Sequence, residues 1–221
     1  MSEWTYKPFL INEYFITRKI TAETLDSVLA NGWRHFGTYF FRYNVSFYQG
    51  QFCNVIPLRV DLQKFTLSKN QQKIWKKNQD LSVLVQPIQI TQNVLDLFEK
   101  HKVKFKANMP ESIYTFLSTN PAKVPCPAIE VGVYQADRLV AMSFLDVGKE
   151  AVSSVYGMYD FALANRSLGI YTMLLEIDFA VKTDCKYYYH GYCFDIPSFY
   201  DYKKKFKGLQ GFDWQGSWND L

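Results

Sequence analysis

Residues 153–191 decide the fold, and they read SSVYGMYDFALANRSLGIYTMLLEIDFAVKTDCKYYYHG. The stretch begins within residues 151–160, a run rich in Val, Tyr and Ser that is typical of a β-strand. A turn that contains a glycine leads into an apolar-periodic segment, which predicts a helix, and residues 186–194 predict another strand. Strand, turn, helix and strand in this order predict a right-handed crossover within one sheet. Free backbone N–H groups at the start of this helix offer a place for an anionic ligand.

Tight turns separate further strand-like segments on the N-terminal side of this unit. Three consecutive segments predict an antiparallel meander: residues 128–134, 138–147 and 151–160. Helices are expected after three polar cap residues: Thr21, Ser68 and Thr91. Additional strands are expected over residues 33–48, 53–60 and 81–90. Pro57 places the second of these at a sheet edge or a bulge, because proline cannot donate to a ladder.

Downstream of the crossover, residues 197–206 predict a helix and residues 212–218 a last strand. A meander, a crossover helix, a further strand and then another helix and strand is an acetyltransferase-like order. The predicted fold class is therefore α+β, with a GNAT-like (acyl-CoA N-acyltransferase-like) mixed sheet flanked by helices. We expect residues 1–90 to form a smaller N-terminal α/β part and residues 91–221 the GNAT-like transferase domain.

Composition limits the functions that this chain can serve. With 221 residues, 48% of them apolar, the chain can bury a large core as one domain or two small ones. Aromatic residues make up 18%, and we expect most of them to fill the core, with the remainder free to line a substrate cleft. A net charge of only +4 excludes a histone-like binder, so any nucleic-acid contact must come from local patches.

The four cysteines are scattered without a C-x-x-C pair, so no metal site is predicted. The first residues lack the basic and apolar regions of a signal peptide. No apolar run approaches the ~20 residues that a membrane span needs. We therefore expect reduced thiols and a cytoplasmic location.

The turn before the crossover helix carries the pattern R-x-x-G-x-Y, from Arg166 through Gly169 to Tyr171. It is similar to the R/Q-x-x-G-x-G/A loop with which acetyl-CoA-dependent N-acyltransferases hold pyrophosphate. Tyr171 stands where a small residue would let the pyrophosphate approach. This difference favours an acyltransferase fold with another acyl donor.

Several sequence blocks resemble the arginyl- and leucyl-tRNA–protein transferases. The blocks span about residues 53–209 in the family's order: residues 54–61, 154–160, 166–171 with 176–177, 187–192, and 202–203 with Phe206. The resemblance implies transfer of an amino acid, arginine or leucine, from charged tRNA to the N-terminal α-amine of proteins that begin with an acidic residue. It implies aminoacyl-tRNA and such proteins as partners.

Some positions depart from the family's pattern, and they bear on donor and acceptor specificity more than on the reaction class. Of the family's N-terminal cysteine cluster, which is linked to metal or iron–sulfur binding, only Cys53 lies at a corresponding position. His190 occupies a usually apolar place. Tyr200 replaces Met, Gly208 replaces Pro and Gln210 replaces Glu.

The reaction makes modest chemical demands, since the aminoacyl ester of charged tRNA is already activated. Neither a metal nor ATP is required, and no cofactor is predicted. The enzyme must hold amine and ester carbonyl at ~3–3.5 Å. It must also stabilise the oxyanion and deliver a proton to the departing ribose oxygen.

Five residues are predicted to be catalytic: Tyr156, Tyr159, Asp160, Glu176 and Tyr192. The first three end a strand where ligands commonly enter such folds, although Tyr159 packing in the core and Asp160 capping a turn are open alternatives. For Glu176, two roles remain open: a general base and a solvated residue on the helix surface. For His190 the structural role is favoured over proton transfer.

Eight residues are predicted to bind substrate: Arg59, Arg166, Ser167, Gly169, Tyr171, Gly191, Tyr202 and Lys203. Arg166 is the strongest candidate, because its planar fork suits a phosphate or an acidic side chain; capping of a turn is the alternative. Arg59 lies inside an apolar strand and therefore needs a partner carboxylate or an anionic substrate.

Two groups of lysines are predicted to bind tRNA: Lys69, Lys73, Lys76 and Lys77 on one helix face, and Lys204 and Lys205 near the C-terminus. A solvated helix face is the alternative for the first group. At the level of the whole protein, two alternatives remain: an acetyl-CoA-dependent N-acetyltransferase, and a non-catalytic binder of charged tRNA or acidic N-termini.

Overall fold

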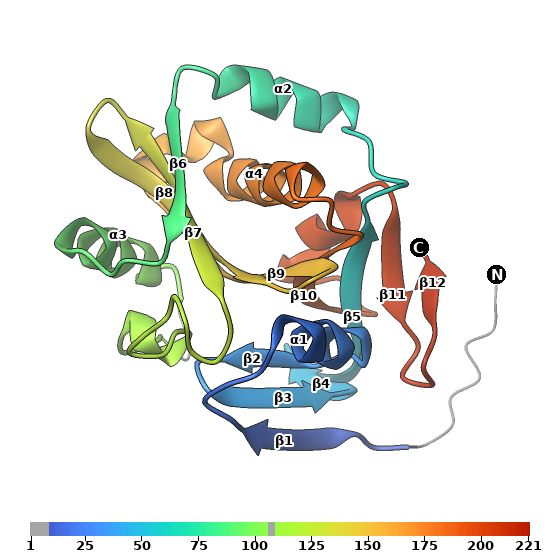
Figure 1. Ribbon diagram of the computed structural model, residues 1–221. Helices are drawn as coiled ribbons and strands as arrows, with labels where there is room; N and C mark the ends of the chain where they lie inside the picture. Colours follow the sequence, from blue (N-terminus) through green and yellow to red (C-terminus); the bar gives the residue numbers. More distant parts are fainter. Residues whose placement is uncertain (1–8, 106–108) are drawn as a thin grey trace.

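The computed structural model describes residues 9–105 and 109–221, and a large mixed sheet forms its centre (Figure 1). This sheet has nine strands. In spatial order they are β12 (Trp218–Asp220), β11 (Leu209–Phe212), β5 (Gln51–Asp61), β10 (Tyr187–Phe194), β9 (Ala151–Tyr159), β8 (Arg138–Val147), β7 (Ala128–Gln135) and β6 (Ser82–Pro87), with β4 (Val45–Tyr48) also paired to β5. The α+β class is confirmed.

The predicted crossover is present. β9 and β10 pair in parallel, and α4 (Leu168–Lys182) connects them, whereas the other strand pairs of the sheet are antiparallel. The predicted meander is also confirmed, as β7, β8 and β9. Parallel strands cannot be joined by a tight turn, so the long apolar helix between them is a geometric necessity.

Helices cover both faces of the sheet. On one face α4 packs on β7, β8 and β9, and α2 (Lys69–Lys77) packs on the outer side of α4 (Figure 1). On the other face α3 (Gln92–Lys102) packs on β8 and β9 through a separate apolar cluster. Because α4 is covered by the sheet and by α2, it is apolar nearly all round.

A smaller three-stranded sheet lies beside the main one. Its order is β1 (Asn12–Ile16), β3 (Tyr39–Tyr43) and β2 (Arg34–Phe36), and it packs next to α1 (Ala22–Ala30) (Figure 1). Leu25 and Leu29 of α1 are fully buried against Ala151 and Tyr189 of the main sheet. The small sheet is thereby held next to the short parallel pair of β9 and β10.

Most predicted helix starts are confirmed. The Thr21 side chain caps α1, and Ser68 forms a capping box with Gln71 at the start of α2. Thr91 precedes α3 but makes no side-chain cap bond. The segment predicted as a helix over residues 197–206 is a 3-10 helix, η3 (Phe199–Lys205).

Two strand predictions need correction. Residues 33–48 form three strands, because a turn with positive φ at Gly37 reverses the chain between β2 and β3. Residues 212–218 do not form one strand; Asp213 accepts backbone bonds from Gln215 and Ser217, which closes a hairpin between β11 and β12.

Pro57 lies in an internal strand, not in an edge strand, yet its position explains why proline is tolerated. On the side away from β10, β5 pairs with β4 through residues 51–54 and with β11 through residues 58–60. Pro57 falls between these two pairings.

Segments on both sides of residue 90 build the main sheet, since β5 and β6 pair with β10 and β7. Within the described residues no helix is long and apolar enough to cross a membrane. Residues 1–8, on which the prediction of no signal peptide partly rests, lie outside the described residues.

Candidate active site

β9 and β10 pair over a short distance and then separate. Their register covers Tyr187 to Tyr189 against Ala151 to Ser153. Beyond it β9 continues along β8, and β10 continues along β5 after a bulge between Tyr189 and Gly191. Gly191 has φ of +101°, which favours glycine. Polar groups in this opening must find partners other than a neighbouring strand.

Arg34 of β2 supplies one such partner. Its Nη1 donates to the Ser153 hydroxyl at 2.9 Å, and its Nη2 donates to the carbonyl of Ser154. The guanidinium is thus held against β9 where the parallel pairing ends. Burial lowers the pKa of Arg34 below its ordinary value, although the group keeps its charge near neutral pH.

Lys203 of η3 approaches the same opening from the side of β10. Its Nζ donates to the carbonyl of Tyr192 at 3.2 Å. A Cβ atom placed on Gly191 would lie 2.8 Å from Lys203 Nζ and 3.8 Å from Arg34 Nη2, so both cations converge on this glycine. Burial, and next the charge of Arg34, lower the pKa of Lys203 to about 7. Among the described residues, neither cation has a carboxylate within 4.0 Å.

Glu176 of α4 faces the opening from the other side of β9. Its carboxyl group is fully buried and accepts from the Ser154 hydroxyl at 3.1 Å and from the Tyr188 hydroxyl. Burial raises the pKa of Glu176 to about 7, against the lowering effect of these hydrogen bonds. The alternative of a solvated helix glutamate is therefore wrong. Two groups with near-neutral pKa values, Glu176 and Lys203, lie around one strand opening, as acid–base sites require.

Other predicted residues join this cluster. Tyr192 donates its hydroxyl to the carbonyl of Gly32 at 2.6 Å, and burial raises its pKa. Burial raises the pKa of Tyr202 to about 12. His190 stacks on Tyr188, and its Nε2 lies 3.0 Å from the carbonyl of Lys203. Burial lowers the pKa of His190 to about 3, so this ring is neutral near pH 7 and acts as a support for Lys203.

A second group of predicted residues lies at the start of α4, in contact with α2. Arg166 binds Asp80 through two bonds of 2.8 and 2.9 Å. The buried Tyr171 ring packs on Trp75, and its hydroxyl donates to the carbonyl of Asn78 at 3.4 Å. Ser167 has φ of +55° and makes no side-chain cap bond.

Gly169 approaches Tyr159 closely. A Cβ atom on Gly169 would lie 3.0 Å from the Tyr159 ring, so the absence of a side chain allows α4 to pack on β9. Asp160 accepts from the backbone N–H of Ala162 and lies 3.4 Å from Arg138. The non-catalytic alternatives for these two residues therefore match contacts in the structure: Tyr159 packs against α4, and Asp160 caps a turn.

Tyr156 and Arg59 lie in further, separate surroundings. Tyr156 stacks on Phe116 at a centroid distance of 4.1 Å, and its buried hydroxyl has no hydrogen-bond partner among the described residues. Arg59 donates to the Gln210 amide oxygen at 2.8 Å and to the Tyr189 hydroxyl at 3.2 Å. The Arg59 guanidinium also lies over the rings of Tyr187 and Trp218. Its burial is compensated by an amide, a hydroxyl and aromatic rings, not by a carboxylate.

The predicted tRNA-binding lysines fall into two surroundings. Those of α2 are all exposed, and Lys77 also donates to the carbonyl of Asn165. Lys204 pairs with Asp201 at 2.8 Å and donates to the carbonyl of Phe194, whereas Lys205 is exposed.

Sequence reasoning missed Arg34, Ser153 and Tyr188. Arg34 stands in an aromatic run and reaches residues 119 and 120 positions away, so no local signal points to its role. For Tyr188 the sequence did contain a signal: three consecutive tyrosines at residues 187–189 in a predicted buried strand indicate that at least one hydroxyl needs a buried hydrogen-bond partner.

Comparison with known proteins decides the family. A family model described as "Arginine-tRNA-protein transferase, C terminus" matches residues 93–213, more than half of the chain. This chain belongs to that family. It is accordingly a transferase, and the predicted family and enzyme class are confirmed.

Curated relatives agree with this assignment. An aspartate/glutamate leucyltransferase of Helicobacter hepaticus is 27% identical over 205 residues, covering 89% of this chain and 82% of the relative. One of Thiobacillus denitrificans is 27% identical over 218 residues, covering 93% and 84%. Among solved structures, L-PGS from Bacillus licheniformis overlaps 73% of this chain and 60% of its own, at a TM-score of 0.47 and 12% identity. That overlap is too weak to carry a conclusion.

The raised pKa of Glu176 predicts a pH-dependent stability. Between the ordinary value of 4.5 and about 7, the folded protein binds more protons at this site than the unfolded chain does. Wild type therefore loses stability through Glu176 as the pH rises through this window, by roughly 2–3 kcal/mol. In Glu176→Gln this contribution is absent, because an amide does not titrate.

Urea unfolding of both proteins at pH 5 and pH 8 measures the effect. All other titrating groups, Lys203 included, are shared, so their contributions cancel in the difference between the two proteins. Equal pH dependence in wild type and variant would show that Glu176 does not titrate in this window.

Proposed function

We propose that this protein transfers an amino acid, leucine or arginine, from aminoacyl-tRNA to the N-terminal α-amine of proteins that begin with Asp or Glu. Family membership supports the transfer from tRNA, and the names of the curated relatives favour leucine and acidic acceptors. The observation that carries the acceptor assignment is the pair of cations, Arg34 and Lys203, that converge on Gly191 without a carboxylate.

Arg34 and Lys203 are the residues that we assign to the acidic side chain of the acceptor. Two partly buried cations that make no direct ion pair are costly, although Asp146 and Glu176 lie in the surroundings of Arg34, and a carboxylate placed between them relieves this cost. The bound carboxylate also favours the charged form of Lys203 and so raises its pKa from about 7. Arg59 and Arg166 remain predicted substrate contacts, but both already use their donors on internal partners.

Glu176 is the residue that we assign to proton transfer. The acceptor amine attacks the ester carbonyl carbon, the bond to the ribose oxygen breaks, and one amine proton must reach that oxygen. The Ser154 hydroxyl donates to Glu176, and the Ser154 carbonyl accepts from Arg34, so this residue offers a route for the proton. A pKa of about 7 lets Glu176 both accept and return a proton near neutral pH.

The remaining predicted residues keep their proposed roles. The Tyr156 hydroxyl, which has no partner among the described residues, and the Tyr192 hydroxyl are proposed contacts to the aminoacyl group. Tyr159 at the end of β9 and Asp160 directly after it keep their proposed roles as well. The start of α4, with Ser167, Gly169 and Tyr171, is a proposed wall of the donor site. Tyr171 and Trp75 fill the place where pyrophosphate would approach, which disfavours acetyl-CoA as donor.

A GNAT-like fold remains our proposal for the architecture. Support comes from the meander, the crossover helix and the separation of β9 from β10. The division into residues 1–90 and 91–221 and a cytoplasmic location likewise remain proposals.

Transfer of labelled amino acids from charged tRNA to peptides tests the proposed function. With bulk charged tRNA and peptides that begin with Asp, Glu, Asn, Gln or Gly, labelled leucine or arginine should appear on the Asp and Glu peptides. Acetyl-CoA in place of charged tRNA should give no product. Acetyl transfer, or aminoacyl transfer that ignores the first residue, would contradict the proposal.

Replacement of Lys203 tests the acceptor contact. Lys203→Met keeps the length of the side chain and removes the charge, so kcat/KM for Asp and Glu peptides should fall about ten- to a hundredfold, the size of one charge-assisted contact. Activity on Asn and Gln peptides should change little. Lys182→Met, at an exposed position on α4, is the matched control and should leave all rates unchanged. An equal loss on all peptides would assign Lys203 to the reaction centre or to tRNA.

Salt dependence tests the lysines of α2. Each phosphate that a lysine neutralises adds about 0.7–0.9 to the slope of log K against log salt. In the double variant Lys73→Ala, Lys76→Ala the slope for tRNA binding should fall by about 1.5. A matched double variant at Lys149 and Lys182, also exposed, should keep the slope. If both variants keep it, the α2 lysines form only a solvated face.

A further inference from the structure

Three potential metal ligands meet in the interior, next to the residues that line the strand opening. They are His35 of β2, Cys126 of the loop before β7, and Asp146 near the end of β8. All three are buried, and one ligand atom from each lies within 4.8 Å of the other two. His35 and Asp146 are 111 residues apart in the sequence, so no short metal-binding motif could reveal the cluster.

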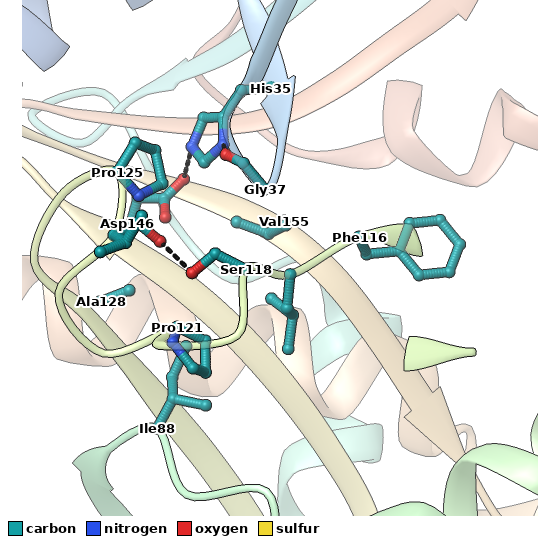
Figure 2. Close-up of a pocket in the computed structure, with 12 residues that line it drawn as sticks. His35, Gly37, Ile88, Phe116, Ser118, Pro121, Pro125, Ala128, Asp146 and Val155 are labelled. Carbon is teal, nitrogen blue, oxygen red and sulfur yellow. Dashed lines mark hydrogen bonds and ion pairs between the residues drawn. The ribbon is translucent and has the colours of Figure 1, made fainter. Parts of the chain in front are cut away.

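The hydrogen bonds of His35 define how its ring is used. Nδ1 lies 3.0 Å from the carbonyl of Gly37, which can only accept, so Nδ1 carries a proton (Figure 2). In the neutral ring Nε2 then presents its lone pair, and it does so 2.7 Å from a carboxylate oxygen of Asp146. Two facing lone pairs repel, so a proton or a metal ion must lie between them.

The third ligand distinguishes the two possibilities. A proton shared by His35 and Asp146 completes an ion pair and needs no sulfur atom nearby. The thiol of Cys126 nevertheless lies beside both groups, in the loop before β7. His35 and Asp146 also line a small cavity, together with Ser118 and Pro125 (Figure 2). Nitrogen, sulfur and oxygen donors on three sides of one point are the ligand set of a zinc-type ion.

We propose that His35, Cys126 and Asp146 bind a divalent ion of the zinc class. The carbonyl of Gly37 holds the ring orientation, as the outer partner of a metal-binding histidine commonly does. The adjoining cavity of about 10 Å³ has room for about one water molecule, which would complete a tetrahedron. Nε2 and the Asp146 oxygen, now 2.7 Å apart, would have to separate by about 0.6 Å to reach the edge of a zinc tetrahedron, about 3.3 Å.

Binding also changes the state of the thiol. In the metal-free protein, burial, and next the charge of Asp146, raise the pKa of Cys126, so the thiol keeps its proton. A bound ion displaces this proton to the solvent and coordinates the thiolate.

The ion would connect three separate parts of the chain: the small sheet, the loop before β7, and the main sheet. His35 is adjacent to Arg34, and Asp146 pairs with Ser153, the residue that Arg34 binds. A bound ion therefore fixes β2 against β8 and β9 and holds Arg34 in the strand opening. The site itself is independent of the proposed transfer reaction.

Cobalt titration of the purified full-length protein tests the site. After chelation and dialysis, one equivalent of Co²⁺ should bind and give the visible bands of a tetrahedral ion, with a near-ultraviolet thiolate-to-cobalt band. One equivalent of Zn²⁺ should remove these bands and raise the melting temperature. Cys126→Ser should abolish the thiolate band and weaken binding by at least about 100-fold, more than the loss of an outer partner costs.

Cys185→Ser, at another buried free cysteine, is the matched control and should bind like wild type. If Cys126→Ser does not fold, the thiolate band in wild type and in the control still reports sulfur ligation. Absence of stoichiometric binding to wild type, or binding without a thiolate band, would overturn the proposal and leave His35 and Asp146 as a buried ion pair. Neither result depends on transferase activity, so this test can fail while the proposed function holds.

Discussion

The short parallel pairing between β9 and β10 is the constraint on which the rest of the structure depends. Each strand keeps its outer partner, β8 or β5, while α4 must cross from one to the other. After three residue pairs the strands therefore separate, and their facing polar groups lack a ladder. Side chains from three other elements supply the missing hydrogen bonds: Arg34, Glu176 and Lys203. The charged cluster is thus a consequence of the crossover geometry.

Desolvation gives this cluster its chemical character. The same burial raises the pKa of Glu176 and lowers that of Lys203, and both arrive at about 7. Under the proposed acceptor contact, an acidic side chain compensates the two cations, whereas an amide of the same shape leaves them uncompensated. A site of this kind discriminates more by the penalty on the neutral ligand than by attraction to the charged one. Under this proposal, the free-energy cost of the two unpaired cations in the free site is the source of its selectivity.

Local patterns were sufficient to predict the crossover unit, the meander and most helix caps, because these depend on periodicity and cap chemistry within about ten residues. Predictions failed where a distant element sets the environment. For Glu176 the sequence left a base and a solvated residue open, and the sheet decides between them: Ser154 of β9 and Tyr188 of β10 donate to its fully buried carboxyl group. Arg34 carried no signal, because its partners lie across the sheet. For Arg59 the sequence predicted a partner carboxylate or an anionic substrate; among the described residues its donors instead reach Gln210 and Tyr189, and two aromatic rings lie under its guanidinium.

The start of α4 shows how one position in a fold can change its use. The loop is similar to the one with which acetyl-CoA-dependent N-acyltransferases hold pyrophosphate, where a small residue stands at the position of Tyr171 and lets the pyrophosphate approach. Here Tyr171 and Arg166 contact Trp75 and Asp80, and these contacts attach α2 to α4. The attached helix presents four exposed lysines to solvent. The loop therefore has no space for a pyrophosphate group, while the lysines of α2 form a basic surface outside it. Such a surface suits tRNA, whose phosphates are spread over a large molecule. Under the proposed function, Tyr171 therefore has two consequences: it occupies the space that a compact anion would need, and it helps to attach the helix that carries the basic surface.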